Sequence, residues 1–310
     1  MIHKPRKIFV NKNKWTEEYV YPYEKTILLF VTDICNLRCE YCFNRGNLNS
    51  NKTSTLGIMN LDYIRKIILA NVGVDKYDIM GGEPLLHPQF DEIVKLLMKY
   101  NKKIGLYTNG FLIKKYLNDQ YQNFKISISF QSITCPVKSY KPISDISDGI
   151  KRFQNIYPIK LVLLLNNKNK LQISNMVDYV EKEFTEIDKI TIGAVRNEED
   201  YWNDNYNYVV PFEEYAEIIQ NFIDNYEGRL NVDIFTKGYL YTDKMPRNLP
   251  NQLGRFKCIF PRNKYTPSLY GIAKGEMLDL EPSIPINFSD PGYSQINGIE
   301  WTDKIHLIKK

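Results

Sequence analysis

Three cysteines lie close together in the segment CNLRCEYC, which spans residues 35–42. Because Cys35, Cys39 and Cys42 come from so short a stretch, a compact loop can point all three thiolates at one centre. Soft thiolate ligands select iron–sulfur clusters, zinc or copper(I). A structural zinc site needs a fourth ligand, usually from a second cysteine pair or a histidine pair. The other cysteines and the histidines are scattered along the chain: Cys135, Cys258, His3, His87 and His306. Three thiolates without a fourth ligand suit a four-iron cluster with one iron open to another molecule.

Simpler interpretations of the triplet remain open at this point. Short cysteine motifs recur freely, so the triplet alone also fits a structural zinc knuckle or three unconnected cysteines. A reactive centre needs further elements to position it, and these can be sought in the rest of the sequence.

The cysteine segment follows a continuous apolar run of strand length, residues 26–32. Strand-like and helix-like runs then alternate along the chain. Asn60 is placed to cap the first helix, and Gly228 closes the last one. We predict strands at 26–32, 77–80, 103–108, 124–130, 160–165 and 187–195. We predict helices at 61–70, 88–100, 111–117, 146–156 and 211–226, and one that carries Ile173, Val177 and Val180.

Six strand–helix units in a row predict an α/β fold with parallel strands and right-handed crossovers. The strands are apolar on both faces, as buried parallel strands should be. An open doubly wound sheet and a partial barrel both fit, and periodicity does not choose between them. In either fold the reactive residues belong at the C-terminal ends of the strands, and the cysteine segment comes just after the first strand.

Composition places the chain among soluble proteins with a substantial core. It has 310 residues, of which 43% are hydrophobic and 13% aromatic, with a net charge of +5. No basic block or nucleic-acid motif is present, so nucleic-acid binding is not expected. No apolar run follows the basic N-terminus as in a secretory signal, and runs such as 161–165 are far too short to span a bilayer. We expect a cytoplasmic protein without membrane contact, whose thiols stay reduced.

The character of the sequence changes after Gly228. Residues 229–310 are rich in Pro, Gly, Asn and Tyr and contain only short apolar runs. We predict an N-terminal extension at 1–24, the main domain at 25–228, and a smaller, loop-rich C-terminal extension at 229–310. This extension is expected to contain a few strands and to pack over the open edge or mouth of the main domain.

The CxxxCxxC spacing, with Tyr41 directly before the last cysteine, resembles the signature of the radical S-adenosylmethionine (SAM) superfamily. The resemblance implies one [4Fe–4S] cluster on Cys35, Cys39 and Cys42, with the fourth iron chelating the amino and carboxylate groups of SAM. It also implies reductive cleavage of SAM to methionine and a 5′-deoxyadenosyl radical, which takes a hydrogen atom from the substrate. The protein then supplies binding, orientation and exclusion of water.

Two glycine-containing segments occur in register with this resemblance. MGGEP, residues 80–84, lies where the superfamily carries its GGE motif. The backbone at Gly81 and Gly82 is then expected to receive the SAM amino group, with Glu83 shaping the turn. YTNG, residues 107–110, matches a TNG motif of many relatives and makes Asn109 a further cofactor-binding candidate. Taken alone, each segment also reads as an ordinary turn.

Later strands supply polar candidates for the SAM carboxylate and ribose, and backbone for the adenine. The candidates implied by the resemblance are Ser127, Ser129, Gln131, Asn166, Asn167 and the backbone of Gly193 to Val195. Arg196 could meet a carboxylate or phosphate of the substrate. Many relatives have Asp-Gly where this chain has Gln131 and Ser132, a departure at the expected SAM contact. The four motifs come in the expected order across about residues 25–197, and the resemblance therefore favours a partial (β/α)6 TIM-type barrel.

The C-terminal segment 254–278 resembles the start of a SPASM or twitch region. Cys258 is kept, but Leu278 and Leu280 stand where further cysteines would be expected. Since one thiol cannot hold a cluster, we expect no auxiliary cluster. Cys258 and Cys135 are instead candidate hydrogen-atom donors to a substrate radical, the alternative for each being a small buried hydrophobe.

The sequence therefore predicts a radical SAM enzyme that acts on a peptide, as in modification of ribosomal peptides, or on a small metabolite. The expected partners are this substrate and a reductase such as flavodoxin or ferredoxin. A nucleotide substrate, as in viperin-like or cofactor-building relatives, is the alternative within the class. A non-catalytic zinc or iron–sulfur binding module is the alternative outside it.

Overall fold

The computed structural model of the 310-residue chain describes much of the sequence, with gaps. The described residues are 6–11, 14–19, 25–39, 41–42, 57–134, 142–195, 208–234, 256–260, 264–266, 278–279 and 281–284. Side chains are described within these ranges except in the first two and in 256–279, and at Phe212, Glu213 and Ala216.

The described strands form one curved sheet in the order β12-β11-β10-β3-β4-β5-β6-β7-β8-β9-β1-β2. The strands from β10 through β3 to β9 run parallel to their neighbours, whereas β1, β2, β11 and β12 are added antiparallel. The parallel strands are β3 (Thr26–Phe30), β4 (Lys76–Met80), β5 (Lys103–Thr108), β6 (Phe124–Phe130), β7 (Ile159–Leu165), β8 (Lys189–Ala194), β9 (Asn231–Ile234) and β10 (Phe256–Phe260). The antiparallel ones are β1 (Arg6–Asn11), β2 (Lys14–Tyr19), β11 (Lys264–Thr266) and β12 (Leu278–Asp279).

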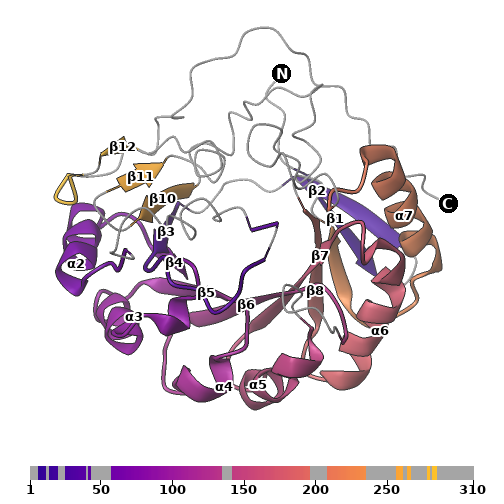
Figure 1. The fold of residues 1–310 in the computed structure, drawn as a ribbon, viewed down its shortest axis with the longest axis horizontal. Helices are drawn as coiled ribbons and strands as arrows, with labels where there is room; N and C mark the ends of the chain where they lie inside the picture. Colours follow the sequence, from indigo (N-terminus) through magenta and orange to yellow (C-terminus); the bar gives the residue numbers. More distant parts are fainter. Residues whose placement is uncertain are drawn as a thin grey trace, which may run out of the picture.

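Helices cover the outer side of this sheet, and the sheet curves around an inner side (Figure 1). The helices are α2 (Leu61–Ala70), α3 (Phe90–Lys99), α4 (Ile113–Tyr116), α5 (Ser147–Phe153), α6 (Ile173–Glu183) and α7 (Phe212–Asn225). Three short 3-10 turns, η1 (Pro84–Leu86), η2 (Ser144–Ile146) and η3 (Lys170–Gln172), precede α3, α5 and α6. The structure thus confirms the α/β fold with a partial barrel.

Each parallel strand divides its residues between two sides, because successive side chains of a strand point to opposite faces. On the outer side, every second residue joins the continuous apolar core that the helices bury, as Ile126, Ile128 and Phe130 of β6 do. On the inner side, Ser127 and Ser129 of the same strand remain partly exposed. The inner residues of β7 are also partly exposed, so this part of the barrel interior is accessible to solvent.

The predicted elements of the main domain are confirmed within a few residues at their ends. Asn60 caps α2 as expected, since its side chain accepts a hydrogen bond of 2.8 Å from the N–H of Tyr63. Strand β9 adds to the six predicted parallel strands; it has only four residues, and Asp233 interrupts its apolar pattern. Strands β1, β2 and β9–β12 come from the segments predicted as extensions, and the three-part division itself stays a prediction.

No helix in the described ranges is both long enough and apolar enough to cross a membrane.

Candidate functional site

Three of the predicted motifs meet at the C-terminal ends of neighbouring strands. The cysteine segment follows β3, the GGE turn follows β4, and the TNG turn follows β5. Because β3, β4 and β5 are adjacent and parallel, their C-terminal ends lie at the same edge of the barrel. We call this edge the upper mouth.

Close backbone packing explains the two glycines of the GGE turn. The N–H of Gly82 donates to the carbonyl of Thr32 at 2.7 Å, and the N–H of Glu83 donates to the carbonyl of Ile34 at 2.7 Å. A Cβ on Gly82 would lie 2.2 Å from the Ile34 oxygen, and one on Gly81 would lie 2.5 Å from the Thr32 oxygen. Both contacts are far inside van der Waals range, so these positions need glycine to hold the loop that carries the cysteines.

Glu83 is the central acceptor of the upper mouth. It is fully buried, with 0% exposure. Its Oε1 accepts from the Thr108 hydroxyl at 2.7 Å and from the N–H of Leu85 at 3.2 Å, and its Oε2 accepts from the N–H of Asn109 at 2.9 Å. A buried carboxylate is tolerable when it is hydrogen-bonded in this way. Glu83 therefore joins the GGE turn to the TNG turn.

Asn109 extends the connection to the cysteine segment. Its Nδ2 donates to Oδ1 of Asn36 at 2.8 Å, across 73 positions of sequence. Its Oδ1 accepts from the N–H of Phe111 at 3.1 Å. Asn36 directly follows Cys35, so the position of this cysteine is coupled through Asn109 to Glu83.

The cysteines themselves form no disulfide and lie in the loop after β3. Cys39 is buried, while Cys35 and Cys42 are partly exposed. The N–H of Leu37 donates to Sγ of Cys35 at 3.4 Å, and the N–H of Cys42 donates to the carbonyl of Cys39 at 3.2 Å. Within the described part of the chain, no three His, Cys, Asp or Glu side chains already converge as a metal site. A cysteine Sγ moves on rotation about χ1 alone, so cluster binding would require the three thiols to turn toward a common centre.

Tyr41 reaches across the upper mouth to the far side of the barrel. Together with Val195 and Tyr208 it forms a small apolar cluster, separate from the main core. The rings of Tyr41 and Tyr208 lie 5.8 Å apart, centroid to centroid. Lys168 Nζ donates to the hydroxyl of Tyr208 at 2.9 Å and lies 4.5 Å from its ring centroid. Tyr41 and Val195, predicted to bind the cofactor, are thus brought together, and Tyr208 joins them.

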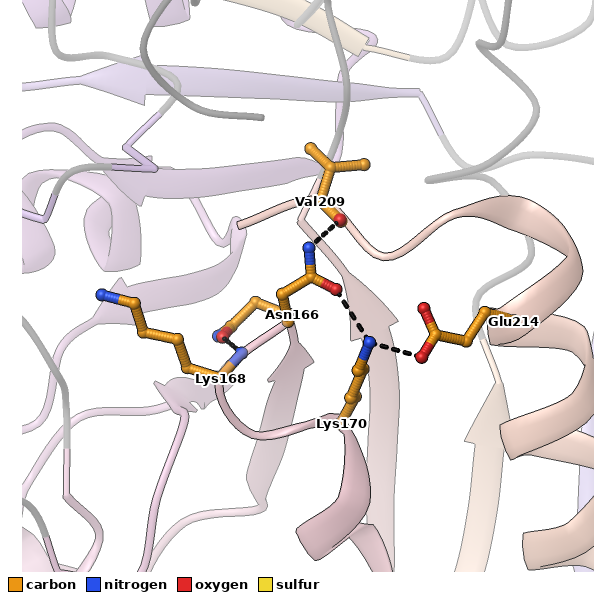
Figure 2. A network of polar contacts seen from close by, with 6 residues as sticks. Asn166, Lys168, Lys170, Val209 and Glu214 are labelled. Atoms are coloured by element: carbon orange, nitrogen blue, oxygen red, sulfur yellow. Dashed lines mark hydrogen bonds and ion pairs between the residues drawn. The ribbon is translucent and has the colours of Figure 1, made fainter. Parts of the chain in front are cut away.

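The loop after β7 is tied to the segment before α7, as Figure 2 shows. Asn167 donates through Nδ2 to the carbonyl of Val209, and its Oδ1 accepts from Lys170 Nζ at 3.1 Å. Lys170 also pairs with Glu214. Both functional groups of Asn167 are therefore engaged within the protein. These contacts tether the loop after β7 to the segment before α7, and the ribose contact considered from the sequence stays a prediction.

Asn166 begins the same loop at the end of β7. Its Oδ1 accepts from the N–H of Lys168 at 2.9 Å, and its own N–H donates to Oδ1 of Asn169 at 2.7 Å. Asn169 Nδ2 also donates to the carbonyl of Gln131, at 2.7 Å. The ends of β6 and β7 are thus fastened by Asn169, which brings the predicted Gln131 and Asn166 into one region of the upper mouth.

Ser132 follows Gln131 where many relatives carry the glycine of an Asp-Gly pair. It is 6% exposed, and its hydroxyl lacks a hydrogen-bond partner among the residues that the structure describes. Such a hydroxyl is an available partner for a polar ligand group.

Lysines line the opposite, N-terminal edge of the barrel, which we call the lower rim. Each of five successive strands has a lysine at or near its N-terminal end. By the alternation of side chains along a strand, these lysines fall on the inner side of the barrel. They are Lys76, Lys103, Lys125, Lys160 and Lys189. Lys76 and Lys103 are directly paired in register. Two buried carboxylates offset part of the charge: Asp78 lies 3.5 Å from Lys76, and Asp233 lies 2.9 Å from Lys189. Positively charged lysines gathered at one rim are suited to an anionic ligand.

Three predicted residues are less fully placed. Cys135 and Arg196 lie outside the described residues. The backbone of Cys258 is in β10, where it pairs with Leu28 of β3. The proposed roles of Cys135 and Cys258 as hydrogen-atom donors stay predictions.

Sequence reasoning missed Asn36, Asn169 and Tyr208 as parts of the upper mouth. Asparagine is common in ordinary turns, and the hydrogen-bond partners of Asn36 and Asn169 are distant in sequence. Tyr208 belongs to no motif. A signal existed only for Asn36, since it lies within the cysteine segment.

His87, just beyond the GGE turn, is predicted to make stability dependent on pH. It is 3% exposed, with Nε2 2.8 Å from the Met59 carbonyl oxygen and Nδ1 accepting from the N–H of Gln89 at 3.0 Å. Burial lowers its pKa below the ordinary 6.5, although the contact with Met59 opposes this. The unfolded chain therefore takes up a proton near pH 6.5 while the folded protein does not. The free energy of unfolding should fall as the pH decreases below 6.5, by at most about 1.4 kcal/mol per pH unit.

Urea unfolding of the wild type and of His87→Gln between pH 7.5 and 5.5 measures this effect. The difference in unfolding free energy between the two proteins isolates His87 from the carboxylates that titrate in both. A pH-independent difference would contradict the prediction.

Comparison with known proteins shows which family model matches the chain and which solved structures have a similar fold. Residues 29–166 match the model of the radical SAM superfamily. GTP 3′,8-cyclase of Staphylococcus epidermidis is 30% identical over 216 residues, which are 64% of this chain and 62% of the cyclase. This chain thus spans less than two thirds of the length of that curated relative.

Solved structures share the fold at low sequence identity. SuiB of Streptococcus suis, solved with its precursor peptide SuiA, superposes with a TM-score of 0.61 at 15% identity, over 81% of this chain and 61% of SuiB. The His-tagged enzyme anSMEcpe with bound AdoMet gives a TM-score of 0.64 at 14% identity, over 86% of this chain and 77% of that one. At these identities the likeness concerns the fold alone.

Proposed function

Because residues 29–166 match the model of the radical SAM superfamily, we propose that the chain is an enzyme that binds a [4Fe–4S] cluster and SAM and abstracts a hydrogen atom from its substrate. The observation that carries this proposal is the hydrogen-bonded assembly of the cysteine segment with the GGE and TNG turns. We place the reaction in the cytoplasm, where thiols stay reduced.

The donor set fits the cluster. Cys35, Cys39 and Cys42 lie at the upper mouth and form no disulfide, and thiolates are the usual ligands of four-iron clusters. The N–H of Leu37, which points at Sγ of Cys35, is the kind of donor that stabilises thiolate charge. Three ligands leave one iron open for SAM.

The bound cluster and SAM would supply one electron and a 5′-deoxyadenosyl radical, with methionine as the other product. The chain's own residues hold and orient these groups. In the GGE turn the N–H groups of Gly82 and Glu83 are used within the protein. The ammonium of SAM would need acceptors, which the carbonyl oxygens of this turn can supply.

The adenosine part of SAM is assigned to the apolar cluster of Tyr41, Val195 and Tyr208. Its aromatic rings present faces and edges against which an adenine can pack. A side chain on the nearby Gly193 would make only ordinary contact with the protein, 3.5 Å from Leu164 Cδ2. The glycine is therefore not required by protein packing there, in keeping with backbone that lies beside a base. Ser129, Gln131, Ser132 and Asn166 are the candidates for the ribose and carboxylate.

For the substrate we propose a nucleoside phosphate rather than a peptide. The Staphylococcus epidermidis relative is named for a reaction of GTP, and the lysines of the lower rim suit a polyphosphate. A strand of five to seven residues spans roughly 16–23 Å, so an extended nucleoside triphosphate could reach from the rim toward the upper mouth. The peptide expected first rested on the tail segment, and the peptide-bound neighbour SuiB shares only the fold.

Anaerobic reconstitution followed by iron, sulfide and product analysis tests the proposed function. We expect about four irons and four sulfides per chain and formation of 5′-deoxyadenosine from SAM with a strong reductant or with reduced flavodoxin or ferredoxin. Product formation should increase with a nucleoside triphosphate and not with peptides. A single zinc per chain and no cleavage of SAM would favour the non-catalytic module instead.

Lysine substitutions at the lower rim test the substrate class. We expect Lys125→Gln and Lys160→Gln each to weaken GTP binding about tenfold, because each removes a charge-assisted contact worth roughly 1.5 kcal/mol. Guanosine, which lacks phosphates, should be much less affected. Equilibrium dialysis with both ligands measures this, and Lys115→Gln, on helix α4, is the matched control. Equal losses for GTP and guanosine would argue against phosphate binding at the rim.

A further inference from the structure

Strands β8 and β9 place a hydroxyl and a carboxylate side by side within the barrel. Thr191 of β8 is paired in register with Asp233 of β9, two neighbouring parallel strands. Paired residues of adjacent strands lie on the same face of a sheet and within contact distance of each other.

Both side chains point to the inner side of the barrel. Their sequence neighbours, Ile190 and Ile192 on β8 and Val232 and Ile234 on β9, belong to the apolar core beneath the helices. Because side chains alternate along a strand, Thr191 and Asp233 face the opposite way, toward the interior that β6 and β7 also line.

These two groups are buried, yet their hydrogen-bonding capacity is only partly used within the described part of the chain. Thr191 is 0% exposed and Asp233 is 1% exposed. One oxygen of Asp233, Oδ2, lies 2.9 Å from Lys189 Nζ. The other, Oδ1, and the Thr191 hydroxyl have no hydrogen-bond partner among the described residues.

Leaving buried polar atoms unsatisfied is costly, and native proteins rarely do so without a reason. Valine has nearly the same shape as threonine and would avoid the cost at position 191. The ion pair with Lys189 offsets the charge of Asp233, so this position favours a neutral donor over a second cation. The pattern is that of a binding site held ready for a ligand at the expense of stability.

The position along β8 suits the middle of a substrate. Lys189, Thr191, Gly193 and Val195 follow one another on the inner side, about 6.6 Å apart at each step. Lys189 is at the lower rim, where phosphates are proposed to bind, and Val195 is at the adenosine cluster of the upper mouth. Thr191 lies between the two.

Resting on the proposed function, we propose that Thr191 and Asp233 form a substrate-binding subsite that accepts two adjacent hydrogen-bond donors of a nucleoside. Oδ1 of Asp233 accepts from one donor, and the Thr191 hydroxyl accepts from the other. Both the N1–H and 2-amino edge of guanine and the two ribose hydroxyls have this chemistry.

Thr191→Val is the decisive variant because it removes the hydroxyl and keeps the shape. We expect thermal stability equal to or above that of the wild type, and GTP binding weakened about tenfold, the loss of one hydrogen bond in a buried site. Asp233→Asn should weaken GTP binding about tenfold or more, because it removes a charged acceptor. Thr185→Val, on an exposed threonine, is the matched control and should change neither property.

Ligand analogues distinguish the two donor sources. If the subsite binds the base, ITP, which lacks the 2-amino group, should bind wild type more weakly than GTP, and one of the two variants, Thr191→Val or Asp233→Asn, should bind ITP as tightly as wild type does. If it binds the sugar, 2′-deoxy-GTP or 3′-deoxy-GTP should behave in this way instead. Either result supports the subsite.

Equilibrium dialysis on the anaerobically reconstituted protein measures these affinities, with SAM cleavage assayed on the same samples. If wild type cleaves SAM and binds GTP, and Thr191→Val binds GTP just as tightly, the subsite would be overturned and the proposed function would stay intact. Wild-type protein that cleaves SAM but binds no nucleotide would overturn both the subsite and the proposed substrate class. Absence of SAM cleavage would separately refute the proposed chemistry.

Discussion

Replacing Cys39 with alanine should leave the anaerobically reconstituted protein without its iron–sulfur cluster. Three thiolates are the complete set of protein ligands in the proposed site, and two cannot hold a four-iron cluster against exchange with solvent. Iron content should fall from about four per chain to near zero, and the cleavage of SAM should fall to background. Since Cys39 is a small buried side chain, the fold itself should tolerate alanine with a modest loss of stability.

Iron and sulfide analysis with the absorbance near the charge-transfer band of the cluster measures this outcome, and circular dichroism checks folding. Cys258→Ala is the matched control, because the expected absence of an auxiliary cluster requires full iron content without this thiol. An iron content of Cys39→Ala equal to that of wild type would show that the cysteine segment is not the cluster site. Reduced iron in Cys258→Ala would instead contradict the expectation for the tail.

Glu83→Ala should be the most destabilising single change at the upper mouth. The substitution would leave the Thr108 hydroxyl and the N–H of Asn109 as buried donors without their acceptor. Each such orphaned group costs roughly 1–3 kcal/mol, so we expect the free energy of unfolding to fall by about 3–5 kcal/mol. The cavity left by the side chain adds to this loss.

Glu83→Gln separates charge from shape. An amide retains one oxygen for Thr108 and Leu85, but its NH₂ group would face the N–H of Asn109, donor against donor. The TNG turn should shift, and Asn109 should lose its hold on Asn36 beside Cys35. We therefore expect SAM binding to weaken by more than tenfold in a protein that remains folded.

Urea unfolding and equilibrium dialysis of SAM measure the two effects of Glu83. Glu92→Gln, on the exposed side of α3, controls for the removal of a negative charge. If Glu83→Gln bound SAM as tightly as the control, the coupling from Glu83 through Asn109 to the cysteine segment would be refuted.

This coupling gives the conventional motifs a shared structural basis. The glycines of the GGE turn are required by the loop that carries the cysteines, and the glutamate by the TNG turn. A ligand at the upper mouth would meet groups that are already hydrogen-bonded to one another, which reduces the entropy lost when they are ordered on binding.

Local sequence was sufficient to predict the helices and the strands from β3 to β8. Apolar residues that recur every 3.6 residues indicate a helix with one buried face, and those that recur every 2 residues indicate a strand with one buried face. Both patterns can be recognised within about a dozen residues. The stripe of α3 and the alternation of β6 are examples. The bounds of the short strand β9 were not predicted because Asp233 breaks its apolar pattern, and the places of β1 and β10 in the sheet were not predicted because β1 pairs with β9 and β10 with β3, both distant in sequence.

The residues that could bind a cofactor or take part in catalysis could also be identified from the sequence. Three closely spaced thiols and the paired glycines pointed to the correct edge of the barrel, since parallel strands bring their C-terminal ends together. Which groups meet at that edge was decided by the order of the strands in the sheet. The contacts of Glu83 with Thr108 and of Asn109 with Asn36 join residues 25 and 73 positions apart.

Contacts between distant segments could not be predicted from any local pattern. Tyr208 meets Tyr41 because the barrel brings their loops together, and Thr191 is paired with Asp233 because β9 is added beside β8. Periodicity encodes how a segment hides its apolar side from water. Pairing between distant segments depends on how all of them pack together. For this reason only the tertiary structure identified the residues that are partners in the proposed site.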